Sequence, residues 1–175
     1  MATGLRLAFG HQARVGKDTV ADYIEMNSGP CVRLAFASRL YQITNNIQST
    51  LGFLVEKDGN LLQKEGTLLR DHYGGDVFIN KVIDDVTATI NNNPATNIII
   101  TDVRYLNEFE ALKKLGFTIV KIIRDNRIIN RDSNHTSETS LVGAKFDAYI
   151  DNNGTLRDLY GQVDDLIKKI ISNDN

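Results

Sequence analysis

The chain has 175 residues, the size of one domain, and its 20 Lys and Arg residues nearly balance 22 Asp and Glu residues, giving a net charge of −2. This balance excludes a protein that relies on attraction to polyanions alone, so nucleic acid is not expected as the main partner. No apolar segment approaches the roughly 20 residues that span a bilayer, and no long apolar run follows a basic start, so we predict a cytoplasmic protein without a membrane partner.

The first part of the chain has the pattern of two strand and helix pairs. Apolar runs predict strands over residues 5–9 and 32–36, and helical spacing predicts helices over 17–26 and 38–51. Ser38 is the expected N-cap of the second helix. The expected apolar face of that helix consists of Leu40, Ile43, Ile47 and Leu51.

Cys31 is the only cysteine, which excludes an internal disulfide framework. Its apolar neighbours, Val32 and Leu34, favour a buried core thiol over a nucleophile. With one cysteine and three histidines scattered along the chain, neither a zinc site nor a nucleophile triad has enough members.

The next block is predicted to be helical and to carry no strand. Helices are expected over residues 61–70 and 76–90, with Gly74 and Gly75 breaking the pattern between them. A turn-rich spacer then precedes the second half of the chain.

The second half is predicted to alternate strands and helices again. Its expected elements are strands over 98–100, 118–123 and 149–150 and helices over 107–115 and 156–170. Together with the first half, they predict an α/β fold with a parallel sheet of about five strands, covered on both faces to give three layers. Ligands in such folds bind beyond the carboxyl ends of the strands, so the loops after Phe9, Phe36, Thr101 and Ile123 are expected to face one crevice.

The segment from Gly16 to Thr19 follows the first strand and opens a helix, which is the context of a phosphate-binding loop. Gly16 allows close approach of the backbone to a phosphate, Lys17 supplies a positive charge, and the helix N-terminus presents free N–H groups. Two departures from the usual pattern leave alternatives open. Either the loop is one residue longer, starting at Gly10, or His11 takes the place of the first glycine. Either Asp18 or Thr19 is the magnesium ligand.

Asp102 and Arg104 follow the strand at 98–100 and are expected at the same crevice. Asp102 is a candidate to orient magnesium-bound water or a neighbouring arginine, the alternative being a cap or turn residue. Arg104 suits bidentate contact with a phosphate, the alternative being a salt bridge to Glu108 one turn on.

Three polar side chains recur at helical spacing and share one face: Gln63, Thr67 and Arg70. This face is either a binding surface or a solvated polar face. Farther along, Arg124, Arg127 and Arg131 crowd into eight residues of a polar segment after a strand end. They form either a lid that brings guanidinium groups to a migrating phosphoryl group or a solubilising loop.

Short motifs in a shared order resemble the deoxynucleoside monophosphate kinases of bacteriophages and their relatives. The resemblance covers most of the chain and is carried by residues 16–24, by Phe36, Ala37 and Leu40, by Leu62, Gln63, Gly66, Thr67 and Arg70, by Asp102, Val103, Arg104, Asn107 and Glu108, by His135, Ser137 and Glu138, and by Asn152, Gly154 and Leu156. At the position of the family's lysine after Leu40 this chain has Tyr41. The resemblance leaves open whether Arg39 takes the place of that lysine.

The resemblance implies a P-loop kinase fold over residues 1–175, with a helical acceptor-binding insertion over about 38–93 and a short lid over about 124–140. It implies transfer of a phosphoryl group from ATP to a deoxynucleoside or nucleoside monophosphate, with Mg2+ as cofactor. Small-molecule nucleotides are then the partners, a homodimer is left open, and the location is the host cytoplasm if the source is viral.

The resemblance also implies roles for particular residues. Catalytic roles fall to Lys17, Arg124 and Arg131. ATP contacts fall to Gly10, Ala13, Arg14, Val15, Gly16, Lys17, Asp18, Thr19, Arg127, Asn152 and Gly154. Contacts with the monophosphate fall to Arg39, Gln63, Thr67, Arg70, Asp102, Arg104 and Glu108. Within this assignment Gln63 is available to the base and Arg70 to the phosphate, while the turn at 152–154 either contacts the base of ATP or is a plain turn.

Three other functions fit a phosphate loop. One is a kinase of another phosphorylated metabolite, of the dephospho-coenzyme-A or phosphomevalonate type. The second is a nucleotide-binding regulatory module without turnover, and the third is an ATP hydrolase that drives a partner.

Overall fold

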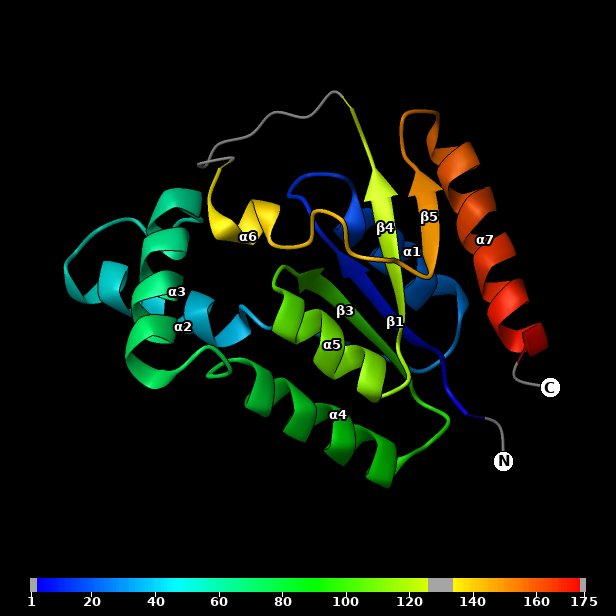
Figure 1. Ribbon diagram of the computed structural model, residues 1–175, viewed down its shortest axis with the longest axis horizontal. Coiled ribbons are helices and arrows are strands. Elements are labelled where there is room, and N and C mark those ends of the chain that lie inside the picture. Colours follow the sequence, from blue (N-terminus) through cyan, green and yellow to red (C-terminus); the bar gives the residue numbers. More distant parts are fainter. Residues whose placement is uncertain (1–2, 126–133, 174–175) are drawn as a thin grey trace.

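The computed structural model describes residues 3–125 and 134–173 and has an α/β architecture built on one five-stranded sheet (Figure 1). All strand pairs are parallel, and the spatial order is β2-β3-β1-β4-β5. The strands are β1 (Arg6–Gly10), β2 (Cys31–Leu34), β3 (Asn97–Val103), β4 (Thr118–Ile123) and β5 (Ala148–Asp151). Because β1 is central, its carboxyl end opens between those of β3 and β4.

Helices cover both faces of the sheet and its carboxyl edge (Figure 1). One face carries α1 (Lys17–Asn27) and α7 (Leu156–Asn173), and the other carries α4 (Ile79–Asn92) and α5 (Leu106–Lys114). Beyond the carboxyl edge lie α2 (Ser38–Thr50), α3 (Gly59–Tyr73) and α6 (Thr136–Thr139). The predicted three-layer α/β fold with five parallel strands is confirmed.

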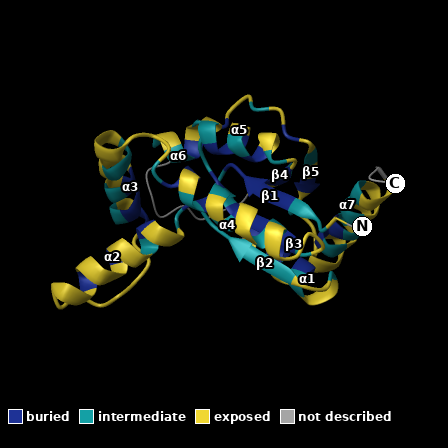
Figure 2. Ribbon diagram, turned by 90° about the horizontal axis from the view of Figure 1, so that it is seen from below, coloured by how far each residue is buried: buried dark blue, intermediate teal, exposed yellow. Residues whose placement is uncertain are grey.

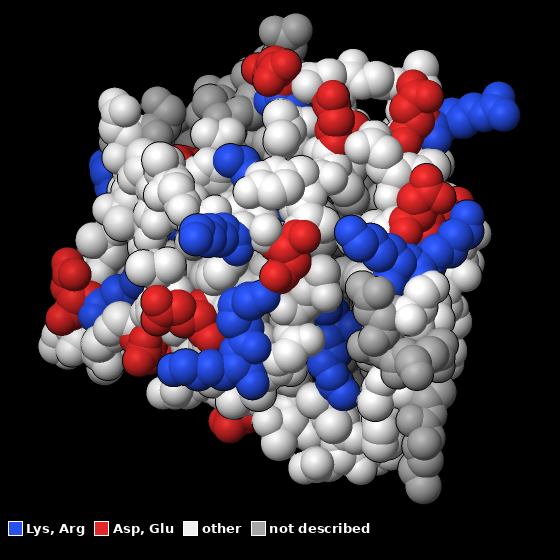
Figure 3. Space-filling view, turned by 45° about the vertical axis from the view of Figure 1, so that its right-hand side comes forward, with Lys and Arg blue, Asp and Glu red and all other residues white. Residues whose placement is uncertain are grey.

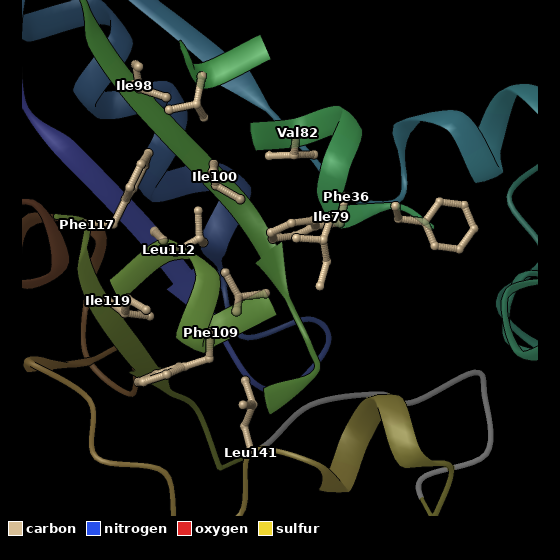
Figure 4. Packing of buried hydrophobic residues seen from close by; sticks show 14 of the residues in the cluster. Phe36, Ile79, Val82, Ile98, Ile100, Phe109, Leu112, Phe117, Ile119 and Leu141 are labelled. Atoms are coloured by element: carbon tan, nitrogen blue, oxygen red, sulfur yellow. The ribbon is translucent and has the colours of Figure 1, made fainter. Parts of the chain in front are cut away.

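The sheet is buried on both sides, which explains why its central strands are continuous apolar runs. In β3, Ile98 and Ile100 join the core under α4 and α5, whereas Ile99 joins the core under α1 and α7. Figure 4 shows Ile98 and Ile100 packed with Leu112 and Ile119 in the first of these cores. Burying one such side chain contributes about 1.5–3 kcal/mol.

The strand and helix predictions are confirmed within a few residues at most boundaries, and the predicted crevice is present. The helix expected over 76–90 begins later, at Ile79, because residues 74–78 form a turn in which Val77 N donates to Gly74 O at 3.1 Å. As predicted, the described residues from 38 to 93 contain no strand.

The predicted N-cap of α2 is wrong. Ser38 is the first residue of the helix, Ala37 occupies the cap position, and the Ser38 hydroxyl donates to Ala35 O at 2.8 Å. The approach to the helix is held from outside instead, because the Asp102 carboxylate accepts hydrogen bonds from Phe36 N and Ala37 N. This carboxylate fixes the chain that leads into α2, but no described side chain caps the free N–H groups of the first turn.

The predicted apolar face of α2 is buried only at its first member. Leu40 is buried, but Ile43, Ile47 and Leu51 are 38%, 41% and 65% exposed. Figure 2 shows the reason, because α2 extends away from the sheet and most of its residues are exposed. Apolar spacing predicted the helix but not what the helix packs against.

Cys31 is half-buried at the start of β2 and packs against the core under α1 and α7, so the predicted core thiol is only partly covered. Burial still raises the pKa of this thiol to about 11, and the expectation that it is no nucleophile therefore has a physical basis.

Charged side chains of both signs are interspersed on the molecular face shown in Figure 3. In the part of the chain that the structure describes, no helix combines the length and the apolar character needed to cross a bilayer.

Candidate active site

The loop between β1 and α1 has the backbone of a phosphate-binding loop. His11 and Arg14 are the two described non-glycine residues with positive φ, at 77° and 58°, and Gly16 has φ 101°. Residues 12–15 separate His11 from Gly16, which is the usual spacing between the two glycines of such a loop. The positive φ of His11 therefore favours the alternative in which His11 takes the place of the first glycine.

Gly16 is required by its conformation and by its neighbour. A Cβ at this position would lie 2.3 Å from the amide nitrogen of Asn152. That amide donates to Val15 O at 2.8 Å and so ties the loop to the turn after β5. Asn152 thus supports the loop, a contact that the sequence prediction of a base-binding turn did not include.

Lys17 is buried at the first position of α1, and its ammonium group donates to Gln12 O inside the loop. Burial, assisted by the positive charge of Arg104, lowers the pKa of Lys17 to about 7. A phosphate dianion bound in front of the loop would oppose the effects of burial and of Arg104 on this pKa. An anionic ligand therefore strongly stabilises the charged form of Lys17.

A crevice opens in front of the loop at the carboxyl edge of the sheet. Its lining includes Lys17, Asp18, Thr19, Thr101, Lys57 and Arg124. On one side it continues into a hollow lined by Thr19, Arg124, Asn152, Asn153, Gly154 and Leu156. Asn152 and Gly154, predicted to contact ATP, are therefore brought next to the predicted phosphate-binding residues.

On its other side the crevice adjoins a second pocket between α2, α3 and the end of β3. Its lining includes Phe36, Leu40, Gln63, Arg70, Glu108 and Ser137. Three residues line both spaces and form their common wall: Tyr41, Asp102 and Arg104. The two predicted binding regions are thus neighbours, separated by one layer of side chains.

Arg70 is held in the second pocket by two aromatic rings. Its guanidinium carbon lies 4.7 Å from the ring centre of Phe78 and 4.0 Å from that of Tyr105. One guanidinium nitrogen donates to Glu108 Oε1 at 3.2 Å. These contacts leave Arg70 in a fixed orientation, which suits bidentate recognition of an oxyanion.

Glu108 is buried and closes the N-terminus of α5. Its Oε2 accepts from Arg104 N at 2.8 Å and from Tyr105 N at 3.1 Å. Burial, with the neighbouring negative charge of Asp102, raises its pKa to about 7, although Arg70 acts in the opposite direction. Glu108 therefore positions Arg70 and the helix, and its own contact with a ligand stays a prediction.

Asp102 is part of the common wall, and each of its carboxylate oxygens accepts one backbone hydrogen bond. Its two oxygens accept from Phe36 N at 2.9 Å and Ala37 N at 2.8 Å. Burial raises its pKa. Asp102 thus has a structural role, as the alternative expected, but it holds the backbone of a distant segment rather than its own turn.

Arg104 does not pair with the side chain of Glu108, so that alternative is wrong. Its Nη1 donates to Glu138 Oε1 at 2.6 Å, and Glu138 Oε2 accepts from Ala13 N of the phosphate loop at 3.1 Å. Glu108 binds only the backbone N–H of Arg104. Glu138 therefore joins the common wall to the phosphate loop.

Some predicted site residues lie outside the pockets. Arg39 is exposed on α2 and bonds Gln42, and Thr67 is exposed on α3 and bonds His135 Nε2 at 3.1 Å. Gln63, by contrast, is buried and lines the second pocket. Arg127 and Arg131 lie outside the described residues.

Sequence reasoning did not select Tyr105 or Lys57. Tyr105 stacks on Arg70, and Lys57 lies over the ring of Tyr41, 5.1 Å from its centre. The position of Tyr105, directly after Arg104 at a strand end, was an available signal. Lys57 lies in a polar turn, and nothing in the local sequence pattern points it at the crevice.

Asp18 and Thr19 line the crevice, and carboxylate and hydroxyl oxygens are ligand types that Mg2+ accepts beside nucleotide phosphates and water. Among the described residues no group of three or more His, Cys, Asp and Glu side chains could hold a metal ion.

The phosphate loop, its buried lysine and the parallel sheet define a P-loop nucleotide-binding protein. The profile of the deoxynucleotide monophosphate kinase family matches residues 61–163, more than half of the chain, and the chain belongs to this family. The matched region begins after the phosphate loop, so loop and family are independent observations.

Two curated relatives carry the family name. A putative deoxynucleotide monophosphate kinase of Acanthamoeba polyphaga mimivirus is 38% identical over 72 residues, which are 41% of this chain and 36% of the relative. The deoxynucleotide monophosphate kinase of Escherichia phage RB69 is 26% identical over 70 residues, 40% of this chain and 28% of the relative. The matching segment thus spans about a third of the length of these relatives.

Among solved structures, an APS kinase of Mycobacterium tuberculosis is similar over 96% of this chain and 99% of its own, with 12% identity and a TM-score of 0.49.

Proposed function

We propose that this protein transfers the γ-phosphoryl group of ATP to a deoxynucleoside monophosphate, giving the diphosphate and ADP. The observation that carries the proposal is the common wall of Tyr41, Asp102 and Arg104 between the phosphate-loop crevice and the second pocket. Two phosphate groups bound on its two sides would be neighbours, as direct transfer requires.

The donor occupies the crevice in front of the phosphate loop. The loop N–H groups and Lys17 hold its phosphates, and the hollow beside Asn152 and Gly154 receives its base. Lys17 is neutralised in part by burial in the free protein and regains its full charge against the phosphates. Mg2+, held by Asp18 or Thr19, would neutralise charge on the phosphate oxygens.

The acceptor occupies the second pocket. Arg70 and Arg104 bind its phosphate, and Gln63 faces its base. An acceptor phosphate is already a nucleophile, so the reaction needs alignment and charge neutralisation more than a protein base. The two arginines supply both, and their fixed orientation limits the reorganisation that transfer would require.

The segment over about 124–140 is proposed as the lid of a single domain. Arg124 lines the crevice, which supports a role near the migrating phosphoryl group. Arg127 and Arg131 are proposed to act with it. Small-molecule nucleotides are the proposed partners.

A coupled ADP-release assay across the nucleoside and deoxynucleoside monophosphates tests the proposal. We expect release that depends on an acceptor, with deoxynucleotides among the accepted compounds. Lys17→Ala is expected to remove most activity while leaving the fold intact, since the Lys17 ammonium group contacts the loop at Gln12 O and is not part of either hydrophobic core.

Each alternative function predicts a different result in this assay. ADP release without an acceptor indicates a hydrolase. Binding of ATP without release indicates a regulatory module, and release only with dephospho-coenzyme A or phosphomevalonate indicates a different kinase. Unchanged turnover in Lys17→Ala would refute the assignment of the donor site.

A further inference from the structure

Helix α6 (Thr136–Thr139) and its N-cap His135 belong to the proposed lid segment, but their side chains have no role in the proposed function so far. The helix and its cap lie between the acceptor-side helix α3 and the phosphate loop, and they make polar contacts in both directions. A four-residue helix has little stability of its own, so these contacts determine its position.

On the acceptor side, α6 is held to α3 by two contacts. His135 Nε2 and Thr67 Oγ1 are 3.1 Å apart, and Gln63 Nε2 donates to Ser137 Oγ at 3.4 Å. His135 Nδ1 accepts from Ser137 N at 3.1 Å and so caps α6. One of these partners, Gln63, lines the second pocket itself.

On the donor side, Glu138 reaches the phosphate loop and the common wall. Its Oε2 accepts from Ala13 N at 3.1 Å, and its Oε1 accepts from Arg104 Nη1 at 2.6 Å. The carboxylate is 4% exposed, which makes its charge-assisted hydrogen bonds strong and their loss costly.

We propose that Glu138 is a positioning residue that couples the two nucleotide sites. An acceptor bound against Gln63 holds α6 in place on α3, and Glu138 then fixes both the loop backbone at Ala13 and the orientation of Arg104. Each nucleotide therefore tightens the binding of the other by the same factor. This inference rests on the proposed function, because it needs two nucleotides bound at once.

The chemistry of the contact suggests a conservative variant. Glu138→Gln keeps the size of the side chain but has one carbonyl oxygen, so it can accept from Ala13 or Arg104 in the present geometry but not from both. The Thr67→Val variant removes one of the two contacts between α3 and α6 while leaving the carboxylate in place, and Thr67→Ser retains the hydroxyl.

The test is equilibrium binding of the β,γ-imido analogue of ATP with Mg2+, with and without the monophosphate that gives the highest turnover in the ADP-release assay. For the unaltered protein we expect the monophosphate to tighten the analogue by about 5-fold or more. In Glu138→Gln this factor should fall close to one, and in Thr67→Val it should fall only in part, because the bond between Gln63 and Ser137 remains, whereas Thr67→Ser should retain it. Glu110→Gln, on the exposed side of α5, is the matched control and should also retain it.

Initial rates give a second readout. Loss of the coupling should lower kcat in Glu138→Gln, and it should raise the KM for each nucleotide measured at saturation with the other. A variant that is only less stable would lose activity as the temperature rises but would keep the coupling factor. Thermal unfolding curves identify such a variant.

The outcomes separate this inference from the proposed function. An unaltered protein that transfers no phosphoryl group to any monophosphate refutes the function. An active protein without coupling, or one whose coupling survives undiminished in Glu138→Gln and Thr67→Val, overturns the role of Glu138. If Glu138→Gln does not fold, Thr67→Val with its Thr67→Ser control decides alone.

Discussion

The phosphate loop depends on a backbone angle at Gly16 that other residues rarely adopt. We predict that Gly16→Ala destabilises the protein more than Gly52→Ala, although both glycines have positive φ, 101° and 77°. Gly52→Ala adds only backbone strain of about 1 kcal/mol, because nothing lies within 4 Å of its Cβ position. Gly16→Ala also displaces the Asn152 amide, at a further cost of roughly 1–3 kcal/mol.

Urea unfolding of both variants measures this difference, and ATP binding should weaken only in Gly16→Ala. Equal destabilisation by the two substitutions would show that the Asn152 contact has no energetic weight.

Arg70 offers a second prediction for a single residue. Arg70→Lys should raise the KM for the monophosphate about 10- to 100-fold, a loss of about 1.4–2.8 kcal/mol, because an ammonium group loses the bidentate fork and the stacking between Phe78 and Tyr105. The KM for ATP should change little. Arg39→Lys is the control, since Arg39 is exposed and outside the pocket. Equal losses for both nucleotides in steady-state kinetics would contradict the acceptor assignment.

Among the elements, α3 carries Gln63 and Arg70 of the proposed acceptor site, and its N-cap lies outside the described pockets. Asp58 Oδ1 accepts from Asn60 N at 2.9 Å and from Leu61 N at 3.0 Å. Asp58→Ala should lower the free energy of unfolding by about 1 kcal/mol while leaving kcat and both KM values unchanged at 25 °C. Asp71→Ala, near the other end of α3, should be neutral or slightly stabilising because it removes a negative charge from the helix C-terminus. Denaturant unfolding compares the two, and equal losses would rule out the cap.

The helices and strands also show how much of the fold the local sequence could predict. Strands and helices followed from apolar periodicity, and β3 was recognised because both of its faces are buried in the sheet. The position of α2 could not be predicted this way, since Ile43 and Ile47 have helical spacing but are 38% and 41% exposed. Apolar periodicity predicts whether a segment forms a helix or a strand, whereas the packing of that element depends on distant segments.

The candidate site was predictable to a similar degree. Lys17, Arg70 and Arg104 were chosen for chemistry and motif order, and the fold brings them to adjoining pockets. Contacts across long sequence separations were not predictable, such as the bond from Ala13 to Glu138 or the stacking of Tyr105 on Arg70. A local sequence pattern does not indicate from which backbone N–H group a distant carboxylate will accept a hydrogen bond.

For the molecule as a whole, two buried ionisable groups make stability depend on pH in opposite directions. The folded-state pKa of Lys17 is about 7, below its ordinary 10.5, so the folded protein binds fewer protons than the unfolded chain between these values. Its contribution to stability is fully present above pH 10.5 and is lost as pH falls to 7. The folded-state pKa of Glu108 is about 7, above its ordinary 4.5, and its contribution is lost as pH rises from 4.5 to 7.

Variants separate these two contributions. Lys17→Met should be more stable than the unaltered protein near pH 6–7, by on the order of 1–3 kcal/mol, and the difference should shrink toward pH 10. Relative to the unaltered protein, Glu108→Gln should gain stability as pH rises from 4.5 to 7. Lys145→Met, at an exposed lysine, should show a flat difference. Thermal unfolding across this pH range measures all three, and parallel curves for Lys17→Met and Lys145→Met would contradict the burial argument.

The same linkage ties nucleotide binding to proton uptake. At pH 8.5 the free protein holds Lys17 mostly neutral, and the phosphates of ATP should restore its proton because they replace a desolvating environment with an anionic one. Calorimetric titrations with ATP in two buffers of different ionisation enthalpy should report uptake approaching one proton. Lys17→Met should bind with little uptake, while Lys145→Met should match the unaltered protein. Equal uptake by Lys17→Met would assign the proton to another group and remove Lys17 from the centre of the phosphate site.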